Sequence, residues 1–369
     1  MSGDPRLRVL QFVEGGGRYG AAVSVLNLTA ALQHRDLEVQ FAVFKGKPLG
    51  ATVEEMGIQV HQVRARKRYD FRGIAHMAKI LRQNRIDVLH THLSKATIIG
   101  SVAARLARVP VVATVHGMNK KYTYMMANRI ITVSNAAKQY LVDQGVPAAK
   151  VEAVYNGIAA DAFAVRPGKA EARKQIGYQE DDLLVGTVSR AERSKGIFEC
   201  VAAVAQLSTE LPNLRYAFVG DGQYLEELRA FAVQKGVADR VRFCGFQENI
   251  APWLSAMDVY LFPTKQEAFG ISLLEAMACQ LPIITTKIGG VPEILDQTCA
   301  RFVPVDSSEA IAASVLDFQK DPSQRDEIAR KGYLRFRDKF TMEASAQQVE
   351  SLYRELIASY VPSRGRVAL

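Results

Sequence analysis

Two acidic residues, Glu267 and Glu275, lie on either side of a Phe-Gly pair in the segment EAFGISLLE, which follows the apolar stretch DVYLFP. A carboxylate at the end of a strand and a second one on the next helix can accept hydrogen bonds from hydroxyl groups. Gly270 gives the chain clearance at the start of that helix, whose free N–H groups can hold a phosphate. A solvated helix with a favourable charge near its N-terminus explains the same pattern without a ligand. The pattern thus predicts either a site for hydroxyls and phosphate or a capped surface helix.

Basic residues and glycines follow other apolar stretches. Arg190 and Lys195 occur in SRAERSKG, after LLVGTV, where they could bind phosphate or form surface ion pairs. Gly16 and Gly17 belong to EGGGRYGA, after RVLQFV, where glycines let backbone N–H groups approach a phosphate. This segment is not GxGxxG, so by itself it is a weak indication of a phosphate site. Asp221, in GDG, either contacts a ligand or caps the next helix.

Three histidines close apolar stretches of the first half of the chain. They are His90, His92 and His116, and Lys95 follows the second of them in HTHLSKA. A single histidine at such a position is more often structural than catalytic. The histidines therefore become candidates for a site only if other features support one.

The elements that would position these residues alternate between strands and helices. Helical stretches, such as 21–32 and 95–107, separate apolar runs with β-propensity. This order predicts an α/β protein with parallel sheets covered by helices on both faces. Ligands of such sheets bind outside the carboxyl ends of the strands, which is where the candidate residues lie. The predicted strands are 6–13, 38–44, 87–92, 111–116 and 129–134, then 183–190, 214–222, 241–245, 258–263 and 281–286.

The pattern is interrupted once, in 156–182, where proline, glycine and charge predict a linker with one short helix. A length of 369 residues also favours two domains. We expect Rossmann-like domains at 1–165 and 178–342, with a C-terminal helix at about 345–369 that packs back on the first.

Composition and motif spacing give no indication of an exported or membrane-spanning protein, of a cysteine-based metal or redox site, or of a carboxylate-bound metal. No signal-like segment opens the chain, and the longest apolar stretch, 96–115, is broken by Arg105 and Arg108, so we expect a cytoplasmic protein. The four cysteines are widely spaced without a CxxC pair, which is typical of core thiols. No DxD-type carboxylate pair suited to a metal–diphosphate bridge follows a strand.

Positive charge is concentrated in the first part of the chain. Residues 1–160 hold 22 Lys+Arg against 10 Asp+Glu, a net charge of +12, while the remainder holds 25 against 28, a net charge of −3. The segments RARKRYDFR and NKKYTYMMANR mix cations with aromatic residues and methionine. Such a mixture suits an anionic membrane surface or acidic lipid, and a merely solvated face explains it equally well. No nucleic-acid-binding motif accompanies the charge.

Several of these segments carry a resemblance to a known family. VSRAERSKG, FVGDGQYLEEL, PTKQEAFGISLLEAMACQLPIITTKIGGVPEI and VYNGI resemble the retaining nucleotide-sugar glycosyltransferases of the GT-B fold, glycosyltransferase family 4, of the type that acts on lipopolysaccharide core or lipid acceptors. The resemblance extends over essentially the whole chain and is most specific between Gly186 and Ile294. It implies two Rossmann-like domains facing a cleft, the first binding the acceptor and the second the nucleotide sugar. It also implies a hexosyl- or N-acetylhexosaminyltransferase.

The resemblance implies a role for each candidate residue. The catalytic residues would be His116, Arg190, Lys195 and Glu267. The donor-binding residues would be Gly16, Gly17, Asp221, Phe269, Gly270, Ile271 and Glu275. The acceptor side would include Arg18, Tyr19, His92 and Lys95. Arg18 and Tyr19 depart from the acidic or small residues often found in that loop, and Gln280 stands where glycine is frequent.

The implied chemistry is transfer of a sugar from a nucleoside diphosphate, with uridine expected and guanosine as the alternative, to a glycan or glycolipid. Arg190 and Lys195 would meet the negative charge that develops on the departing diphosphate, so that no metal or cofactor is required. His116 would orient the donor, and Glu267 and Glu275 would accept hydroxyls of the sugar and the ribose. Peripheral attachment to the inner face of the plasma membrane is a further expectation.

Three other functions use similar features. A nucleotide-sugar epimerase or a phosphorylase would need the same phosphate contacts, and a non-catalytic sugar-binding protein can share the hinged architecture. A nicotinamide dehydrogenase would need GxGxxG after the first strand, which this chain lacks.

Overall fold

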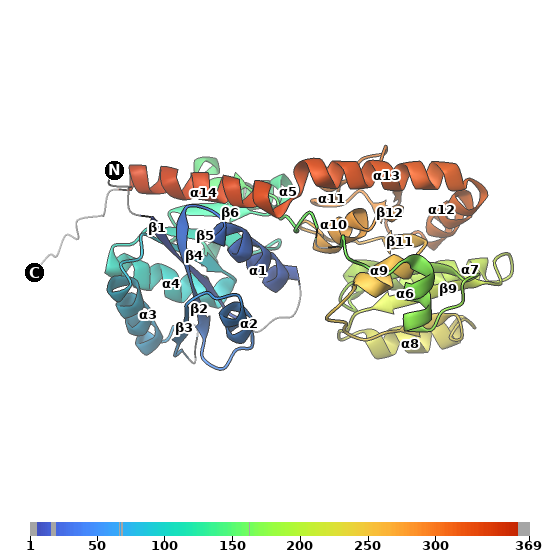
Figure 1. Ribbon diagram of the computed structural model, residues 1–369, viewed down its shortest axis with the longest axis horizontal. Coiled ribbons are helices and arrows are strands. Elements are labelled where there is room, and N and C mark those ends of the chain that lie inside the picture. The colour runs from blue at the N-terminus through green and yellow to red at the C-terminus, as the bar shows by residue number, and fades with distance from the viewer. Residues whose placement is uncertain (1–5, 16–19, 66, 68, 162, 361–369) are drawn as a thin grey trace, which may run out of the picture. The chain divides into compact units, whose positions relative to one another are not determined.

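The computed structural model describes residues 6–15, 20–65, 67, 69–161 and 163–360. These residues form two compact units, each with its own sheet (Figure 1). The first unit comprises Met1–Gly157 and Met342–Leu369, and the second comprises Ile158–Thr341. Both are parallel-sheet α/β units, as the alternation of strands and helices predicts.

The first unit contains a seven-stranded sheet in the order β3-β2-β1-β4-β5-β6-β7. Every neighbouring pair is parallel, and the strand order reverses direction between β1 and β4. In the register of these two strands, Val13 lies opposite His92, so both strands end at the same edge of the sheet. The strands are β1 (Leu7–Val13), β2 (Leu37–Phe44), β3 (Val60–Val63), β4 (Val88–His92), β5 (Val111–Val115), β6 (Arg129–Thr132) and β7 (Val151–Ala153).

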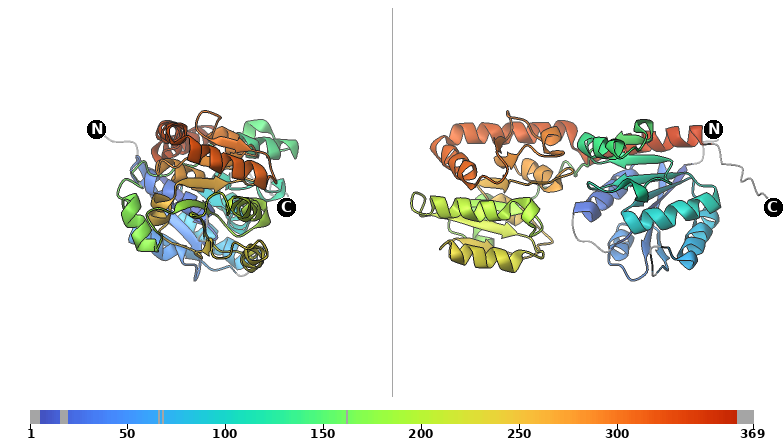
Figure 2. Two further views of the ribbon diagram at one scale, coloured as in Figure 1. Left: turned by 90° about the vertical axis from the view of Figure 1, so that its right-hand side faces the viewer. Right: turned by 180° about the vertical axis from the view of Figure 1, so that it is seen from behind.

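Helices cover both faces of this sheet, as the views of Figure 2 show. On one face, the apolar side of α3 and the small residues of α4 pack over the sheet together with the buried Tyr124. On the other face lie α1, α2 and the C-terminal α14. The helices are α1 (Gly20–Gln33), α2 (Leu49–Glu55), α3 (Phe71–Gln83), α4 (Ser94–Ala107), α5 (Asn135–Asp143) and α14 (Met342–Ser359), with the short 3₁₀ turns η1 (Lys121–Thr123) and η2 (Ala148–Lys150).

The second unit contains a six-stranded parallel sheet in the order β10-β9-β8-β11-β12-β13. Its order reverses direction between β8 and β11, so the segments after these two strands meet at one edge. The strands are β8 (Leu183–Val188), β9 (Leu214–Val219), β10 (Val241–Phe243), β11 (Val259–Phe262), β12 (Ile283–Thr286) and β13 (Arg301–Val303). The helices are α6 (Lys169–Ile176), α7 (Ile197–Leu207), α8 (Leu225–Gln234), α9 (Ala251–Ala256), α10 (Ile271–Ala278), α11 (Val291–Ile294), α12 (Ser308–Lys320) and α13 (Pro322–Lys339), with the 3₁₀ turn η3 (Arg193–Lys195).

The boundary between the units differs from the predicted one. The first unit ends at Gly157 instead of 165, and α6, placed in the linker by the sequence, belongs to the second unit. The reason is the buried Arg173 of α6, whose guanidinium donates to the Asp258 carboxylate at 2.6 Å and to the carbonyl oxygen of Ala256 at 3.1 Å. A charged side chain with several acceptors inside one unit fixes the helix to that unit.

Helix α14 returns to the first unit, begins at Met342 and lies beside α1 (Figure 1). Its buried residues Leu352, Tyr353 and Leu356 share a core with Val9 and Val88 of the sheet. The helix therefore completes a face of the first sheet and also brings the Tyr353 hydroxyl into it.

Replacing Leu352 with alanine is expected to destabilise this core, because the side chain is 2% exposed. Buried leucine-to-alanine changes typically lower the free energy of unfolding by about 2–5 kcal/mol. Thermal unfolding of the variant should begin at a lower temperature, whereas Glu355→Ala, at an exposed position of the same helix, should leave it unchanged. Equal transitions for the two variants would show that α14 is not part of the core.

No helix in the described ranges is long and apolar enough to span a membrane. Cys200, Cys279 and Cys299 are buried free thiols, as expected, whereas Cys244 is only partly buried.

Candidate active site

In the second unit, an ion pair joins two of the predicted catalytic residues. The Lys195 ammonium lies 2.8 Å from Oε2 of the Glu267 carboxylate, and each side chain is 15% exposed. Lys195 follows β8 and Glu267 follows β11, the neighbouring strand of the sheet. The structure thus brings together two residues that lie far apart in the sequence.

Backbone contacts explain why the two segments meet. The carbonyl oxygen of Ser194, next to Lys195, accepts hydrogen bonds from the Thr264 hydroxyl at 3.1 Å and from the Lys265 amide at 2.7 Å. Gly196 has a φ of +69°, and a Cβ atom there would lie 2.0 Å from the carbonyl oxygen of Pro263. Only glycine fits this approach, so the turn that carries Lys195 is held against the end of β11.

The Glu267 carboxylate is fixed through both of its oxygens. Oε2 faces Lys195, and Oε1 accepts hydrogen bonds from the amides of Ala268 at 3.0 Å and Phe269 at 3.3 Å. Its backbone is equally constrained, because a Cβ atom at Gly289 would lie 1.9 Å from the carbonyl oxygen of Glu267. An acceptor held in this way is preorganised and need not be ordered when a ligand binds.

Helix α10 begins directly after Gly270, whose φ of +107° is in the region that favours glycine. The first amides of a helix have no acceptor in its hydrogen-bond ladder and can donate to an anion, and of those of α10 the Leu273 amide donates to the carbonyl oxygen of Gly270 at 3.0 Å. Phe269 contributes backbone only, since its ring is 2% exposed and packs against Phe340 at 6.1 Å between centroids. Ile271 is the first residue of the helix and is partly exposed.

Glu275, on the same helix, has an unusual environment for a carboxyl group. Burial raises its pKa to about 7, from a usual value of 4.5. Near neutral pH the group is therefore present in both charged and protonated forms in the free protein. Perturbed acids of this kind occur preferentially at functional sites.

The two remaining predicted residues of this unit are more exposed. Arg190 forms an ion pair with Glu192 at 2.6 Å, and its side chain is 49% exposed. Asp221 is exposed, and its Oδ1 accepts the amide of Gly222 at 2.7 Å. Both follow strands that neighbour each other, β8 and β9, and the carbonyl oxygen of Asp221 accepts the amide of Ala191 at 2.9 Å. The ion pair of Arg190 is with Glu192, not with Glu267.

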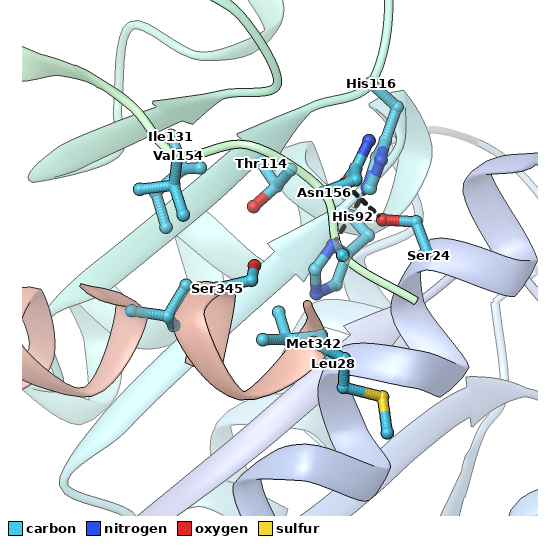
Figure 3. Close-up of a pocket in the computed structure, with 12 residues that line it drawn as sticks. Ser24, Leu28, His92, Thr114, His116, Ile131, Val154, Asn156, Met342 and Ser345 are labelled. Atoms are coloured by element: carbon cyan, nitrogen blue, oxygen red, sulfur yellow. Dashed lines mark hydrogen bonds between the residues drawn. The ribbon is translucent and has the colours of Figure 1, made fainter. Parts of the chain in front are cut away.

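The first unit contains a pocket at the carboxyl ends of β4 and β5 (Figure 3). About 380 Å³ of space in this region holds no protein atoms, and this figure includes open solvent at the mouth of the pocket. His92 and His116 lie side by side in it, with His92 Nδ1 3.0 Å from His116 Nε2. Polar groups of Ser24, Thr114 and Asn156 also line the pocket, and the Ser24 hydroxyl donates to Oδ1 of Asn156 at 2.6 Å. Apolar and further lining residues are Leu28, Ile131, Val154, Gly157, Met342, Ser345 and Val349.

The histidines of this region are neutral at physiological pH. Burial lowers the pKa of His116 to about 4, and burial together with the neighbouring His116 lowers that of His90 to about 3. Burial and the two neighbouring histidines hold the pKa of His92 well below its usual value. His116 is thus suited to neutral hydrogen bonding rather than to holding a proton.

Lys95 lies outside the pocket lining. Its ammonium donates to the carbonyl oxygen of Ala65 at 3.1 Å and lies 4.2 Å from the centroid of the Phe44 ring. Its amide, at the start of α4, donates to the Glu14 carboxylate at 2.5 Å. Leu93 has a φ of 68°, which is unusual for a leucine, and it turns the chain between His92 and this helix.

Four predicted residues, Gly16, Gly17, Arg18 and Tyr19, lie outside the described residues. Of the pocket residues that sequence reasoning missed, Asn156 has the clearest signal, because it belongs to the segment VYNGI that carries the family resemblance. Ser24 and Ser345 lie on helices far apart in the sequence and have no such signal. Within the described ranges, no three His, Cys, Asp or Glu side chains are placed to hold a metal ion.

Comparisons with known proteins match both halves of the chain. Residues 19–162 match the model of Glycosyltransferase Family 4, and residues 168–335 match that of Glycosyl transferases group 1. The chain is 24% identical over 362 residues to the N-acetyl-alpha-D-glucosaminyl L-malate synthase of Bacillus anthracis, covering 92% of this chain and 94% of that protein. It is 28% identical to the UDP-Gal:alpha-D-GlcNAc-diphosphoundecaprenol alpha-1,3-galactosyltransferase of Escherichia coli, covering 60% of this chain and 63% of that protein.

A solved structure supports the fold. The crystal structure of Anabaena HepE in complex with UDP and glucose superposes with a TM-score of 0.84 at 22% identity, covering 96% of this chain and all of HepE. The two family models together account for both units, and the Escherichia coli relative is named a galactosyltransferase. The chain therefore belongs to the GT-B glycosyltransferases of family 4.

Proposed function

We propose that the enzyme transfers a sugar from a UDP-sugar to a glycan or glycolipid acceptor, with retention of anomeric configuration and without a metal ion. The observation that carries the proposal is the ion pair of Lys195 and Glu267 at the strand ends of the second unit, beside the start of α10. It offers a fixed cation, a fixed acceptor and free amides in one unit. A nucleotide sugar has a matching diphosphate and matching hydroxyls.

Each group of the second unit has a proposed partner on the donor. Lys195 and Arg190 stabilise the negative charge that develops on the diphosphate, and the first amides of α10 add their dipoles. Glu267 accepts hydroxyls of the transferred sugar, and Glu275 accepts the ribose hydroxyls. Gly270 allows the phosphate to approach the backbone. When the donor binds, the Lys195 ammonium interacts with both the Glu267 carboxylate and the phosphate oxygens.

Retention follows if the acceptor attacks the face from which the diphosphate departs. The bond from the anomeric carbon to the phosphate oxygen breaks, the new glycosidic bond forms on the same face, and the departing phosphate oxygen takes the acceptor proton. No protein base is needed in this scheme. We propose that His116 accepts a hydrogen bond from a hydroxyl of the transferred sugar, since its pKa of about 4 makes it a weak base.

The relatives support the choice of substrates. HepE was crystallised with UDP and glucose, and the galactosyltransferase is named for UDP-Gal as donor. L-Malate and the diphosphoundecaprenol-linked sugar named for the two relatives are both anionic. An anionic acceptor agrees with the net charge of +12 over residues 1–160.

The neutral state of His116 predicts a flat pH profile for turnover. At saturating donor, kcat should be nearly constant from about pH 5.5 to 8, because a histidine with a pKa of about 4 is unprotonated throughout that range. Protonation at lower pH would place a proton on the accepting nitrogen and reduce kcat. A fall in kcat with a midpoint between about pH 6 and 7 would contradict the neutral assignment.

We also propose that the first unit attaches to anionic membrane surfaces, which would place the enzyme at the inner face of the plasma membrane. The side chains of Phe71 and Tyr122 are 84% and 77% exposed, and each lies close in sequence to lysines or arginines. Binding to phosphatidylglycerol vesicles should exceed binding to phosphatidylcholine vesicles and should weaken as salt rises. Phe71→Ser should weaken it further, whereas Val233→Ser, at an exposed position of the second unit, should not. Equal binding to both kinds of vesicle would contradict the proposal.

A donor panel tests the function. The purified enzyme is incubated with UDP-glucose, UDP-galactose, UDP-N-acetylglucosamine and GDP-mannose, each with and without L-malate or bacterial lipid extract. Acceptor-dependent release of the nucleotide supports transfer. Isomerisation of the donor without acceptor would support an epimerase, phosphate-dependent release a phosphorylase, and binding without turnover a sugar-binding protein.

A further inference from the structure

We propose that Gln11 and Tyr353 are positioning residues, which hold Nδ1 of His116 as a hydrogen-bond acceptor for a ligand hydroxyl. The inference rests on the proposed role of His116 in binding the sugar. It starts from an unexplained atom: Nδ1 of His116 is buried and has no hydrogen-bond partner in the described part of the chain. A buried polar atom without a partner lowers the stability of the folded protein by about 1–3 kcal/mol. We therefore infer that a ligand binds this atom.

The other ring nitrogen of His116 leads into a chain of hydrogen bonds. His116 Nε2 lies 3.0 Å from His92 Nδ1, and His92 Nε2 lies 2.6 Å from the amide oxygen of Gln11. The amide nitrogen of Gln11 donates to the Tyr353 hydroxyl at 2.9 Å. Gln11, His92 and Tyr353 are each 0% exposed, so no water competes for these bonds. The chain runs from the C-terminal helix, through the first strand, to the pocket.

The direction of each bond follows from the Gln11 amide. Its oxygen can only accept, so His92 carries its proton on Nε2. His92 is neutral, so its Nδ1 carries no proton and accepts a hydrogen bond from the N–H of His116 Nε2. His116 is neutral as well, and its Nδ1 presents a lone pair. A sugar hydroxyl that donates can bind this atom, whereas a phosphate or carbonyl oxygen cannot.

A second branch orients the amide. The Tyr353 hydroxyl accepts a hydrogen bond from the Gln11 amide nitrogen. It lies 2.6 Å from Nδ1 of His90, to which it donates a hydrogen bond. His90 Nε2 lies 2.6 Å from the Thr114 hydroxyl, which lines the pocket. Reversal of the Gln11 amide would reverse every bond of both branches and place a proton on Nδ1 of His116. Gln11 thus sets the hydrogen-bonding character of the pocket without touching the ligand.

The first unit contains a matched control. The Gln40 amide oxygen lies 2.8 Å from Nε2 of His61, on strands β2 and β3, and neither residue lines the pocket. Gln40→Leu removes a buried glutamine bonded to a histidine, as Gln11→Leu does, but leaves the pocket chain intact. Tyr353→Phe provides a second variant of the chain that retains the ring and its packing.

The test is a ¹⁵N spectrum of the full-length enzyme labelled at its six histidines, in which protonated and lone-pair nitrogens have different shifts. Loss of signals in His116→Gln assigns that residue. In the wild type and in Gln40→Leu, we expect the proton of His116 on Nε2. In Gln11→Leu and Tyr353→Phe, we expect a shift of the proton toward Nδ1. With the donor that the panel identifies, kcat/KM of both chain variants should fall about tenfold, against less than about twofold for Gln40→Leu.

A wild-type spectrum with the proton on Nδ1 of His116 would overturn the inference. So would a Gln11→Leu variant whose His116 signals and kcat/KM equal those of the wild type. The spectra are independent of turnover, so that absence of transfer with every donor would count against the proposed function and not against the tautomer.

Discussion

Replacing Lys195 with alanine is expected to lower kcat about 100- to 1,000-fold, the usual loss when one charged donor to a developing anion is removed. The ammonium is fixed 2.8 Å from the Glu267 carboxylate, and the Lys195 side chain is only 15% exposed, so water cannot readily replace the ammonium. The fold should persist, because Glu267 retains its bonds to the amides of Ala268 and Phe269. Circular dichroism and the melting temperature check this before the rate of UDP release is measured.

Lys265 supplies the matched control for this variant. It is a lysine of the neighbouring segment after β11, which also carries Glu267, and its ammonium pairs with Glu199 at 2.8 Å and with Asp306. Lys265→Ala should change kcat by less than about tenfold, because it removes a structural ion pair. Near-normal turnover in a folded Lys195→Ala variant, or equal losses in both, would show that Lys195 has no special role.

Glu275→Gln should weaken UDP binding and, at high pH, increase stability. In the folded enzyme the pKa of Glu275 is about 7, above its usual value of 4.5, so ionisation is unfavourable in the folded state. The neutral Glu275 therefore favours the folded state. Its contribution to the free energy of unfolding is fully present below about pH 4.5 and is lost as the pH rises through 7, a difference of about 3 kcal/mol. Glutamine stays neutral, so the variant should be more stable than the wild type at pH 8 and equal to it at pH 4.5.

Nucleotide binding should show the opposite dependence. Two ribose hydroxyls can donate to a carboxylate, but a protonated carboxyl must itself donate, so wild-type affinity for UDP should rise as the pH rises through about 7. Glu275→Gln should bind UDP about 10- to 100-fold more weakly at pH 8, with little dependence on pH. Calorimetry at several pH values measures both effects, and Glu226→Gln, an exposed residue of α8, is the control. A variant that loses stability at pH 8 and binds UDP normally would contradict both assignments.

The sequence predicts the strands that carry the site because each is an apolar run that ends in polar residues. It misses β3, β7 and β13, which have only three or four residues and lie at or near sheet edges, where short runs have no measurable period. The predicted linker helix is correct, but its attachment to the second unit depends on the bond from Arg173 to Asp258, 85 residues apart.

The candidate site, too, is predicted from the sequence only in part. Lys195 and Glu267 are predicted as strand-end residues, and their pairing follows from the order of the strands, which the family resemblance implies and local pattern does not. The partnership of Gln11 with Tyr353 spans 342 residues and has no sequence signal, because a tyrosine on an amphipathic helix is ordinarily only a core residue. Gln280 is explained by the backbone: its φ of 56° at the end of α10 accounts for the glycine expected there.

The rate of acceptor-dependent UDP release in excess chelator tests most directly whether side chains alone stabilise the departing diphosphate. If Lys195, Arg190 and the α10 amides do so, the wild-type rate should be unchanged in EDTA and should not rise when magnesium or manganese is added. Loss of the rate in EDTA, with recovery only on addition of either ion, would contradict that claim.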